Sequence, residues 1–147
     1  MGEAERAITI TRVFDAPRKA VWREWTEAER FADWFGGPES KVPLSSVSMD
    51  VRPEGEWRLT MFAQRGEIHW EGKYLEVAAP ERLVFTVTDE PGADADAHVC
   101  TVVLVDLGDG RTEMRFEQRG PMPPEQVEAA GKGWQGFFDR IAERLAA

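Results

Sequence analysis

The sequence predicts an α+β fold, in which a curved antiparallel sheet of about six to seven strands wraps around a long C-terminal helix. Three observations lead to this prediction. Short alternating runs of apolar and polar residues, separated by turn residues, fill the chain from about residue 46 to residue 118. One long helical pattern closes the chain, and two short ones follow the first strand. Because a single helix cannot cover a flat sheet of this size, we expect the sheet to curl around it.

The first strand begins the chain. Ile8, Ile10 and Phe14 alternate with threonines, which is the period of two that a strand requires. Arg12 falls on the apolar side of this alternation, so its charge needs a partner or an exit to water. The segment 15–17, Asp-Ala-Pro, then ends the strand, with a proline suited to the first position of a helix.

Two short helices are expected next. Val21, Trp22 and Trp25 recur at helical spacing. Thr26 and Glu29 have the spacing of a capping box, in which a threonine hydroxyl and a glutamate satisfy free N–H groups at a helix start. A second helix is therefore predicted from about residue 27 to Phe35.

The central part of the chain alternates strands with turns. A hairpin turn is clearest at Gly108-Asp109-Gly110. An acidic loop is expected between residues 89 and 97. The predicted strands cover residues 46–51, 57–61, 68–77, 83–88, 99–107 and 112–118. Short connections between consecutive strands predict an antiparallel meander.

The long closing helix carries one apolar stripe. The side chains of the stripe are those of Val127, Trp134, Phe138, Ile141 and Leu145. Glycines stand at positions 131, 133 and 136, around Trp134. Each should cost roughly 1 kcal/mol of helix stability relative to alanine. Either another segment approaches the helix closely at these glycines, or the helix borders a space there.

Composition limits the class of protein. The chain has 147 residues, 42% of them hydrophobic, which predicts a single domain over residues 1–147 with a real core. No apolar run reaches membrane-spanning length, and a net charge of −9 argues against nucleic acid or an anionic membrane as partner. Cys100 is the only cysteine, so no internal disulfide can form, which favours a reducing, cytoplasmic location.

Catalytic and metal motifs are not found in the sequence. His69 and His98 are the only histidines, and neither belongs to a spaced ligand set. His69 is expected to face outward. Cys100 shares the face of His98, but strand rise places the two about 7 Å apart, too far for a direct hydrogen bond. We therefore predict no catalytic residue, no metal site and no cofactor.

Two stretches resemble a known superfamily. They are ITITRVFDAPRKAVWREWTEAERFADWF, near the start, and GWQGFFDRIAERL, in the last helix. Together with the element order, they are similar to the START-like, or SRPBCC, superfamily (Bet v-allergen-like), which has the helix-grip fold. The chain looks most like the branch related to the C-terminal domain of the activator of the heat-shock-protein-90 ATPase. The resemblance covers nearly the whole chain.

The resemblance implies a ligand cavity between the sheet and the last helix. Arg12, Tyr74, Gln118 and His98 are candidate polar contacts if they face inward. Core packing is the alternative role for the aromatic residues. A shift of one residue in register would move the side chains of any strand to the opposite face of the sheet. The predicted cavity residues are Phe31, Trp34, Trp57, Leu59, Met61, Trp70, Tyr74, Phe116, Gln118, Trp134, Phe137, Phe138 and Ile141.

Three functional hypotheses follow from the resemblance, since its superfamily hosts many functions on one scaffold. The first is binding of an apolar or amphipathic small molecule, without catalysis. The second is a chaperone-linked protein-interaction domain, which an exposed apolar patch would favour. The third is an enzyme of the cyclase or hydrolase type, which would need polar groups with shifted pKa values in a closed pocket.

Overall fold

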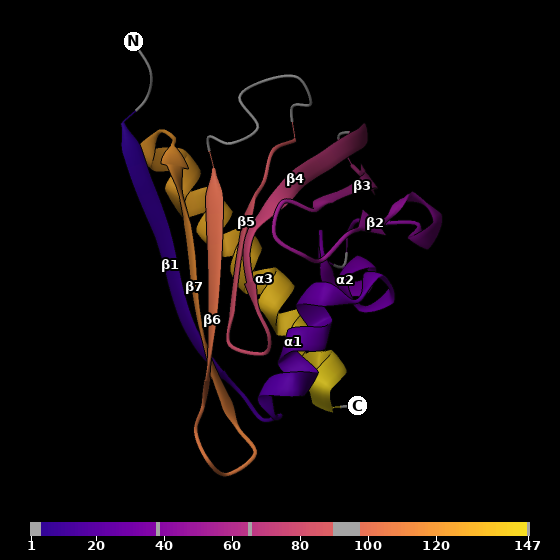
Figure 1. The fold of residues 1–147 in the computed structure, drawn as a ribbon. Helices are drawn as coiled ribbons and strands as arrows, with labels where there is room; N and C mark the ends of the chain where they lie inside the picture. Colours follow the sequence, from indigo (N-terminus) through magenta and orange to yellow (C-terminus); the bar gives the residue numbers. More distant parts are fainter. Residues whose placement is uncertain (1–3, 38, 65, 90–97, 147) are drawn as a thin grey trace.

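The computed structural model describes residues 4–37, 39–64, 66–89 and 98–146. Strand β1 (Glu5–Phe14) leads into helices α1 (Arg18–Thr26) and α2 (Ala28–Trp34) (Figure 1). The remaining elements are the 3-10 turn η1 (Leu44–Ser46), strands β2 (Ser48–Met49), β3 (Glu56–Ala63), β4 (Gly66–Ala78), β5 (Arg82–Thr86), β6 (Val99–Asp106) and β7 (Thr112–Pro121), and helix α3 (Pro124–Ala146). The acidic loop predicted from the sequence lies almost wholly outside the described residues.

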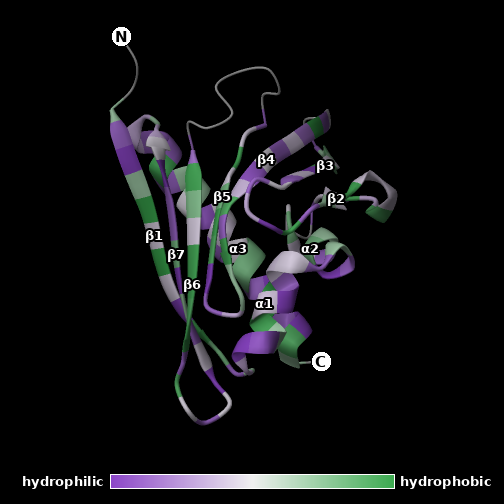
Figure 2. Ribbon diagram, in the orientation of Figure 1, coloured by the Kyte–Doolittle hydropathy of each residue, from purple (hydrophilic) through white to green (hydrophobic). Residues whose placement is uncertain are grey.

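The sheet has the predicted antiparallel, curved form. Its strand order is β1-β7-β6-β5-β4-β3-β2, so β1 closes the meander by pairing with β7. Helix α3 runs across one face of the sheet, and α1 and α2 close its lower end (Figure 1). Strand β6 is hydrophobic over most of its length, as expected of a strand near the middle of a sheet (Figure 2). These features confirm the predicted α+β helix-grip fold.

Two local predictions were wrong. Segment 46–51 forms only the two-residue strand β2, after the turn η1. The predicted capping box does not form: Glu27 is the N-cap of α2 and makes no side-chain cap bond. Thr26 still belongs to α1, where its hydroxyl donates to the carbonyl oxygen of Trp22 at 2.9 Å. A hydroxyl at the end of one helix is satisfied there and is not free to cap the next.

Helix α3 is attached to its neighbours through ion pairs along its C-terminal half. The guanidinium of Arg12 on β1 lies 2.7 Å from the carboxylate of Asp139, so the charge on this strand has an ion-pair partner. Closer to the end of the helix, the buried carboxylate of Glu24 on α1 accepts a hydrogen bond from Arg144 at 2.6 Å. Asp33 on α2 pairs with Arg140 at 2.9 Å and also with Arg144. These ion pairs fix the two short helices against α3.

The backbone of Thr86, at the end of β5, approaches β4 closely at Gly72. The indole nitrogen of Trp57, on β3, crosses over Gly72 and donates to the carbonyl oxygen of Thr86 at 3.0 Å. The backbone N–H of Lys73 donates to the Thr86 hydroxyl at 3.0 Å, in place of a backbone carbonyl. A Cβ atom at Gly72 would lie 1.8 Å from the Thr86 carbonyl oxygen and 2.6 Å from the Trp57 indole nitrogen. Only glycine fits at this crossing.

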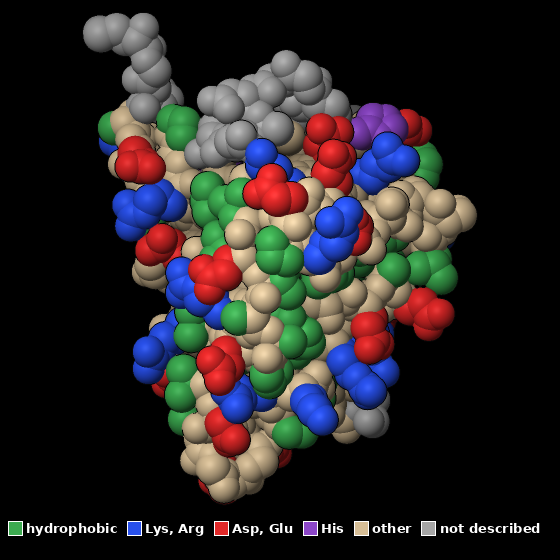
Figure 3. Space-filling view, in the orientation of Figure 1, with side chains coloured by type: hydrophobic (Ala, Val, Ile, Leu, Met, Phe, Trp, Pro, Cys, Tyr) green, Lys and Arg blue, Asp and Glu red, His purple; other side chains and the backbone are tan. Residues whose placement is uncertain are grey.

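The surface carries both charges. Acidic and basic side chains are interspersed on the face shown in Figure 3, with apolar side chains between them. Most of the ion pairs between described residues have two exposed partners, so each contributes little to stability. Among the described helices, none has both the length and the apolar character to cross a bilayer.

Candidate functional site

The space between the sheet and the helices is filled by one continuous aromatic cluster. Trp25, at the end of α1, lies at its centre, with ring centroids 4.8 Å from Trp34, 6.0 Å from Phe116 and 6.3 Å from Trp134. Edge-to-face and stacked contacts at such distances stabilise an apolar interior. Trp25 was not among the residues predicted to line the cavity. Its spacing with Val21 did predict an inward face, but nothing in the sequence indicated that this ring would join three elements.

All of the predicted cavity residues reach this interior. Trp70 and Phe137 are half-buried at its edge, and Gln118 is nearly buried. The other predicted residues are buried: Phe31, Trp34, Trp57, Leu59, Met61, Tyr74, Phe116, Trp134, Phe138 and Ile141. The predicted strand orientations are therefore those of the structure. Whether these residues contact a ligand stays a prediction.

The deep part of the interior is almost closed. A cavity of about 10 Å³ remains there, roughly the room of one water-sized sphere. It is lined by Trp25, Phe31, Met49, Trp57, Tyr74, Leu83 and Phe85. At this place, the cluster packs as a core.

A looser region lies where α2, β4 and α3 meet. The half-buried rings of Trp70 and Phe137 flank Phe35, with ring centroids 5.6 and 5.5 Å from it. A Cβ atom added to Gly133 or Gly136 would meet no atom of the described chain within 4 Å. Gly133 is exposed, and helical spacing places Gly136 about 160° around α3 from Trp134, so this open space lies on the outer side of the helix. Neither a close approach nor an interior space is therefore found at these two glycines. We call Phe35, Trp70 and Phe137 the aromatic mouth.

A chain of hydrogen bonds joins the interior to the top of the sheet. The buried indole nitrogen of Trp134 donates to Gln118 Oε1 at 2.7 Å. Gln118 Nε2, which can only donate, lies 3.2 Å from Nδ1 of the half-buried His98. The amide therefore holds His98 with its hydrogen on Nε2. Of the four predicted polar contacts, Gln118 and His98 form this chain, and Arg12 points to α3.

Three buried polar atoms of the interior have no hydrogen-bond partner among the described residues. They are the indole nitrogens of Trp25 and Trp70 and the hydroxyl of Tyr74. Burial, and to a lesser extent the negative charge of Asp50, raises the pKa of Tyr74 far above its ordinary value, so the hydroxyl stays protonated. All three atoms are therefore hydrogen-bond donors that face apolar surroundings.

Cys100 and His69 differ in exposure and in their partners. Complete burial raises the pKa of the Cys100 thiol far above its ordinary value, so the thiol stays neutral and is a poor nucleophile. His69 is exposed, as predicted, and lies 2.8 Å from Glu67. In the part of the chain that the structure describes, no group of three or more His, Cys, Asp or Glu side chains could hold a metal ion.

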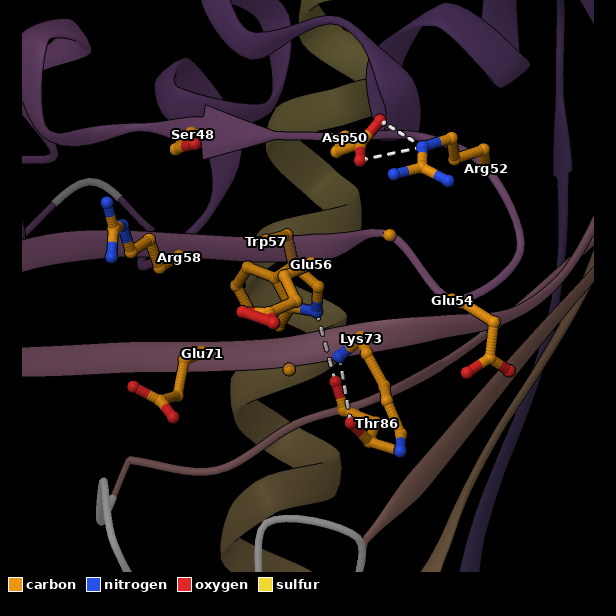
Figure 4. Close-up of a pocket in the computed structure, with 12 residues that line it drawn as sticks. Ser48, Asp50, Arg52, Glu54, Glu56, Trp57, Arg58, Glu71, Lys73 and Thr86 are labelled. Atoms are coloured by element: carbon orange, nitrogen blue, oxygen red, sulfur yellow. Dashed lines mark hydrogen bonds and ion pairs between the residues drawn. The ribbon is translucent and has the colours of Figure 1, made fainter.

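A second hollow lies on the opposite face of β3 and β4, with a volume of about 530 Å³ (Figure 4). Glu56, Arg58 and Glu71 point into it, away from α3. Asp50 and Arg52 form an ion pair at its rim, 2.8 Å apart. The charges of both signs are open to solvent, and Trp57 is the wall between this polar hollow and the deep apolar cavity.

Comparisons with known proteins agree with this architecture. Residues 15–146 match the family described as Activator of Hsp90 ATPase homolog 1-like protein. No functionally curated protein matches the sequence.

Solved structures with the same fold come from several bacteria. A protein from Chromobacterium violaceum is 24% identical, with a TM-score of 0.78 over 96% of this chain and 97% of that one. Protein SA2116 from Staphylococcus aureus is 19% identical, with a TM-score of 0.83 over 98% and 95% of the two chains. The AHSA1 protein from Silicibacter pomeroyi is 18% identical, with a TM-score of 0.82 over 96% and 98%. At these identities, the likeness shows the fold alone.

Proposed function

This chain belongs to the Activator of Hsp90 ATPase homolog 1-like family, and we propose that it binds an apolar or amphipathic small molecule between the sheet and α3. The observation that carries this proposal is the aromatic mouth. There, the half-buried rings of Trp70 and Phe137 flank Phe35 where α2, β4 and α3 meet. An accessible aromatic surface at the edge of an apolar interior is a usual setting of a small-molecule site.

The polar groups near the mouth support a ligand of mixed character. Trp70 presents an indole N–H without a described partner, and the chain from His98 through Gln118 reaches Trp134 behind the mouth. A ligand there would bury an apolar body and direct a few polar atoms toward these groups. The neutral Cys100 thiol supports binding without chemical change. The same unpaired cysteine supports a location in the reducing cytoplasm.

Native mass spectrometry of the freshly purified protein, repeated after denaturing extraction, tests this function. We expect a bound apolar compound that is released on denaturation. The Phe137→Ala variant should retain much less of it, because it removes a half-buried ring from the mouth. Phe62→Ala removes the same ring from an exposed position on β3 and should retain the wild-type amount. Equal retention by both variants would place the ligand elsewhere, and an empty wild-type protein would oppose the binding function.

The family description suggests a second candidate, an interaction with the chaperone Hsp90. One observation favours it: Leu44 and Phe62 are 48% and 47% exposed on the same edge of the sheet. Lys41 and Phe62 exchange backbone hydrogen bonds of 2.9 and 2.7 Å, which places Phe62 beside η1. Exposed apolar side chains that gather at one edge are typical of a protein contact.

The ATPase rate of purified Hsp90, measured with and without this chain, tests the second candidate. We expect stimulation by the wild-type chain and none by Phe62→Glu. Val13→Glu is the control, because Val13 is similarly exposed, at 46%, but lies on β1. An unchanged ATPase rate with the wild-type chain would exclude the activator function.

A further inference from the structure

One edge of the sheet is protected, and the other is not. Strand β2, at one end of the strand order, has only two residues, and the bridge between Lys41 and Phe62 covers the next part of β3. Strand β1, at the other end, runs for ten residues and pairs with β7 without a shift in register. No described strand lies beyond β1 (Figure 1). A long, regular strand with an unpaired edge is a template on which another strand can pair.

The backbone groups on the free side of β1 can be identified from one hydrogen bond. The N–H of Met122, just after β7, donates to the carbonyl oxygen of Ala4, just before β1, at 3.3 Å. In an antiparallel ladder, such bonded pairs recur at every second residue. The even-numbered residues of β1 therefore bond to β7. The N–H and C=O groups that point away from the sheet are those of the odd-numbered residues, among them Ala7, Thr9, Thr11 and Val13.

The side chains of these residues leave the edge open. Thr9 and Thr11 are exposed and uncharged, and Val13 is 46% exposed. Free edges are commonly blocked by a lysine, a proline or a bulge, and the stretch from residue 7 to residue 13 contains none of them. Arg12 is the one charged residue of this stretch, and it points to the inner face, where Asp139 pairs with it. Backbone and side chains are thus both suited to strand pairing.

We propose that β1 pairs with β1 of a second copy of this chain, antiparallel, so that the two sheets become continuous around a two-fold axis at Ile10. This centre places Thr9 opposite Thr11 of the second copy and Ala7 opposite Val13, and each such pair exchanges both of its N–H···O bonds. Pairs of threonines across two strands stabilise a sheet. This contact goes beyond the proposed function, because the edge of β1 is not part of the aromatic mouth on α2, β4 and α3.

The position of the axis follows from the charges on the inner face. A centre at Thr9 would place Arg6 directly opposite Arg12 of the second copy, and like charges in that position destabilise a sheet. A centre at Ile10 instead places Arg12 opposite Ile8 and Arg6 opposite Phe14. Centres nearer to either end of the strand leave fewer residues paired.

A second copy suits this edge better than a foreign segment does. An extended segment of another protein would find the same backbone groups, but specificity in such pairing comes from the side chains. The outward side chains between residues 7 and 13 carry no charge that would select a foreign sequence. A second copy brings threonines to the positions where threonines already stand.

Light scattering after size-exclusion chromatography, at increasing concentrations of the full chain, tests the assembly. We expect a dimer that dissociates on dilution. Amide hydrogen exchange measured by NMR then locates the contact. In the dilute monomer, the N–H groups of Ile8 and Ile10 should exchange slowly and those of Thr9 and Thr11 quickly. In the dimer, all four should exchange slowly, so the alternation along β1 disappears.

Thr9→Pro removes an outward N–H donor without removing a bond to β7. We expect the dimer to dissociate at least about tenfold more readily, because a strand edge with proline cannot complete the ladder. Thr9→Val is the matched control: it also lacks the hydroxyl but keeps the N–H, and its dissociation constant should equal that of the wild type. The melting temperature of the diluted monomer shows whether each variant remains folded.

Two double variants test the pairing without proline. Thr9→Lys with Thr11→Lys places lysines opposite each other across the axis, and we expect roughly fivefold weaker dimerisation. Thr9→Lys with Thr11→Glu places opposite charges there and should dimerise more tightly than the wild type. Both pairs of substitutions change exposed side chains only.

Three results would overturn the proposal. The first is a wild-type chain that stays monomeric at every concentration. The second is a dimer in which the N–H groups of Thr9 and Thr11 still exchange quickly, since another surface then forms the contact. The third is equal dimerisation by the two double variants, or by a folded Thr9→Pro and Thr9→Val. None of these results bears on the aromatic mouth, whose test is ligand retention by Phe137→Ala.

Discussion

The interior has one wall formed by the sheet and another formed by α3. The glycines of the two walls differ in how closely other atoms approach them. On the sheet side, Gly72 is enclosed, and a Cβ atom there would overlap the Thr86 carbonyl oxygen at 1.8 Å. On the helix side, a Cβ atom at Gly133 or Gly136 would meet no atom within 4 Å. The first glycine is required by close approach of the backbone, and the other two face open space on the outer side of α3. Glycines on the two walls therefore have opposite physical meanings.

This difference bears on where an apolar ligand could bind. The tight wall, on the sheet side, includes Trp57, whose indole is bonded to the Thr86 carbonyl beside Gly72 and which separates the polar hollow from the apolar interior. The loose wall, on the helix side, includes the half-buried ring of Phe137. We therefore expect the body of an apolar ligand to contact the helix wall.

Gly72→Ala should have the largest effect on stability. The added methyl group must displace the Thr86 carbonyl or break the Trp57 hydrogen bond, and a backbone carbonyl cannot move aside as a side chain can. Since overpacking of this severity exceeds the usual range, we expect a loss of about 3–5 kcal/mol in the free energy of unfolding. Urea denaturation followed by tryptophan fluorescence measures it.

The matched control is Gly133→Ala, which makes the same chemical change on the loose wall. If both variants unfold at the same urea concentration, the contrast between the two walls is wrong. Gly72 does not have a positive φ angle, so backbone strain does not contribute to its expected loss.

Much of the fold could be predicted because it depends on periodicity. The stripe of Trp134, Phe138 and Ile141 is buried as expected, since helical spacing alone places these residues on one face. Strand alternation likewise placed Trp57 and Tyr74 inside. The role of Gly72 could not be predicted, because it depends on the approach of Thr86 from another strand. The capping prediction at Thr26 failed because the same residue pattern also allows a bond back to Trp22.

The candidate site was predicted less completely for a related reason. Residue type and face predicted which side chains point inward, but the filling of the interior depends on how rings from three layers interlock. Trp25 shows this: its neighbours include rings from α2, β5, β7 and α3, none of which is near it along the chain except α2. Likewise, the missing partners of Trp25 and Tyr74 become visible only when every neighbouring atom is in place.

Trp134→Ala should have the second-largest effect, and it tests where the loose wall begins. Trp134 lies between the two free glycines in sequence, but its ring centroid is 4.5 Å from that of Phe116, and it is buried. We expect a loss of about 3–5 kcal/mol in the free energy of unfolding, because the ring is packed against other aromatic side chains. The change also leaves Gln118 Oε1 without its donor.

Trp134→Phe separates packing from hydrogen bonding at the same position. It keeps most of the ring and removes the indole N–H, so we expect a loss of about 1 kcal/mol by the same urea measurement. If Trp134→Ala costs no more than Trp134→Phe, the ring is not packed core, and the loose wall extends through Trp134.

Gly133→Ala and Gly136→Ala should have the smallest effects, and of the opposite sign. Because neither added methyl group meets a neighbour, the change removes the conformational freedom of glycine in the unfolded chain without a steric cost. Each variant should gain about 0.5–1 kcal/mol in the free energy of unfolding, seen as a higher melting temperature. Since both glycines face the outer side of α3, neither variant should change ligand retention, and a variant that gains stability but loses its ligand would show that this outer face of the helix contributes to binding.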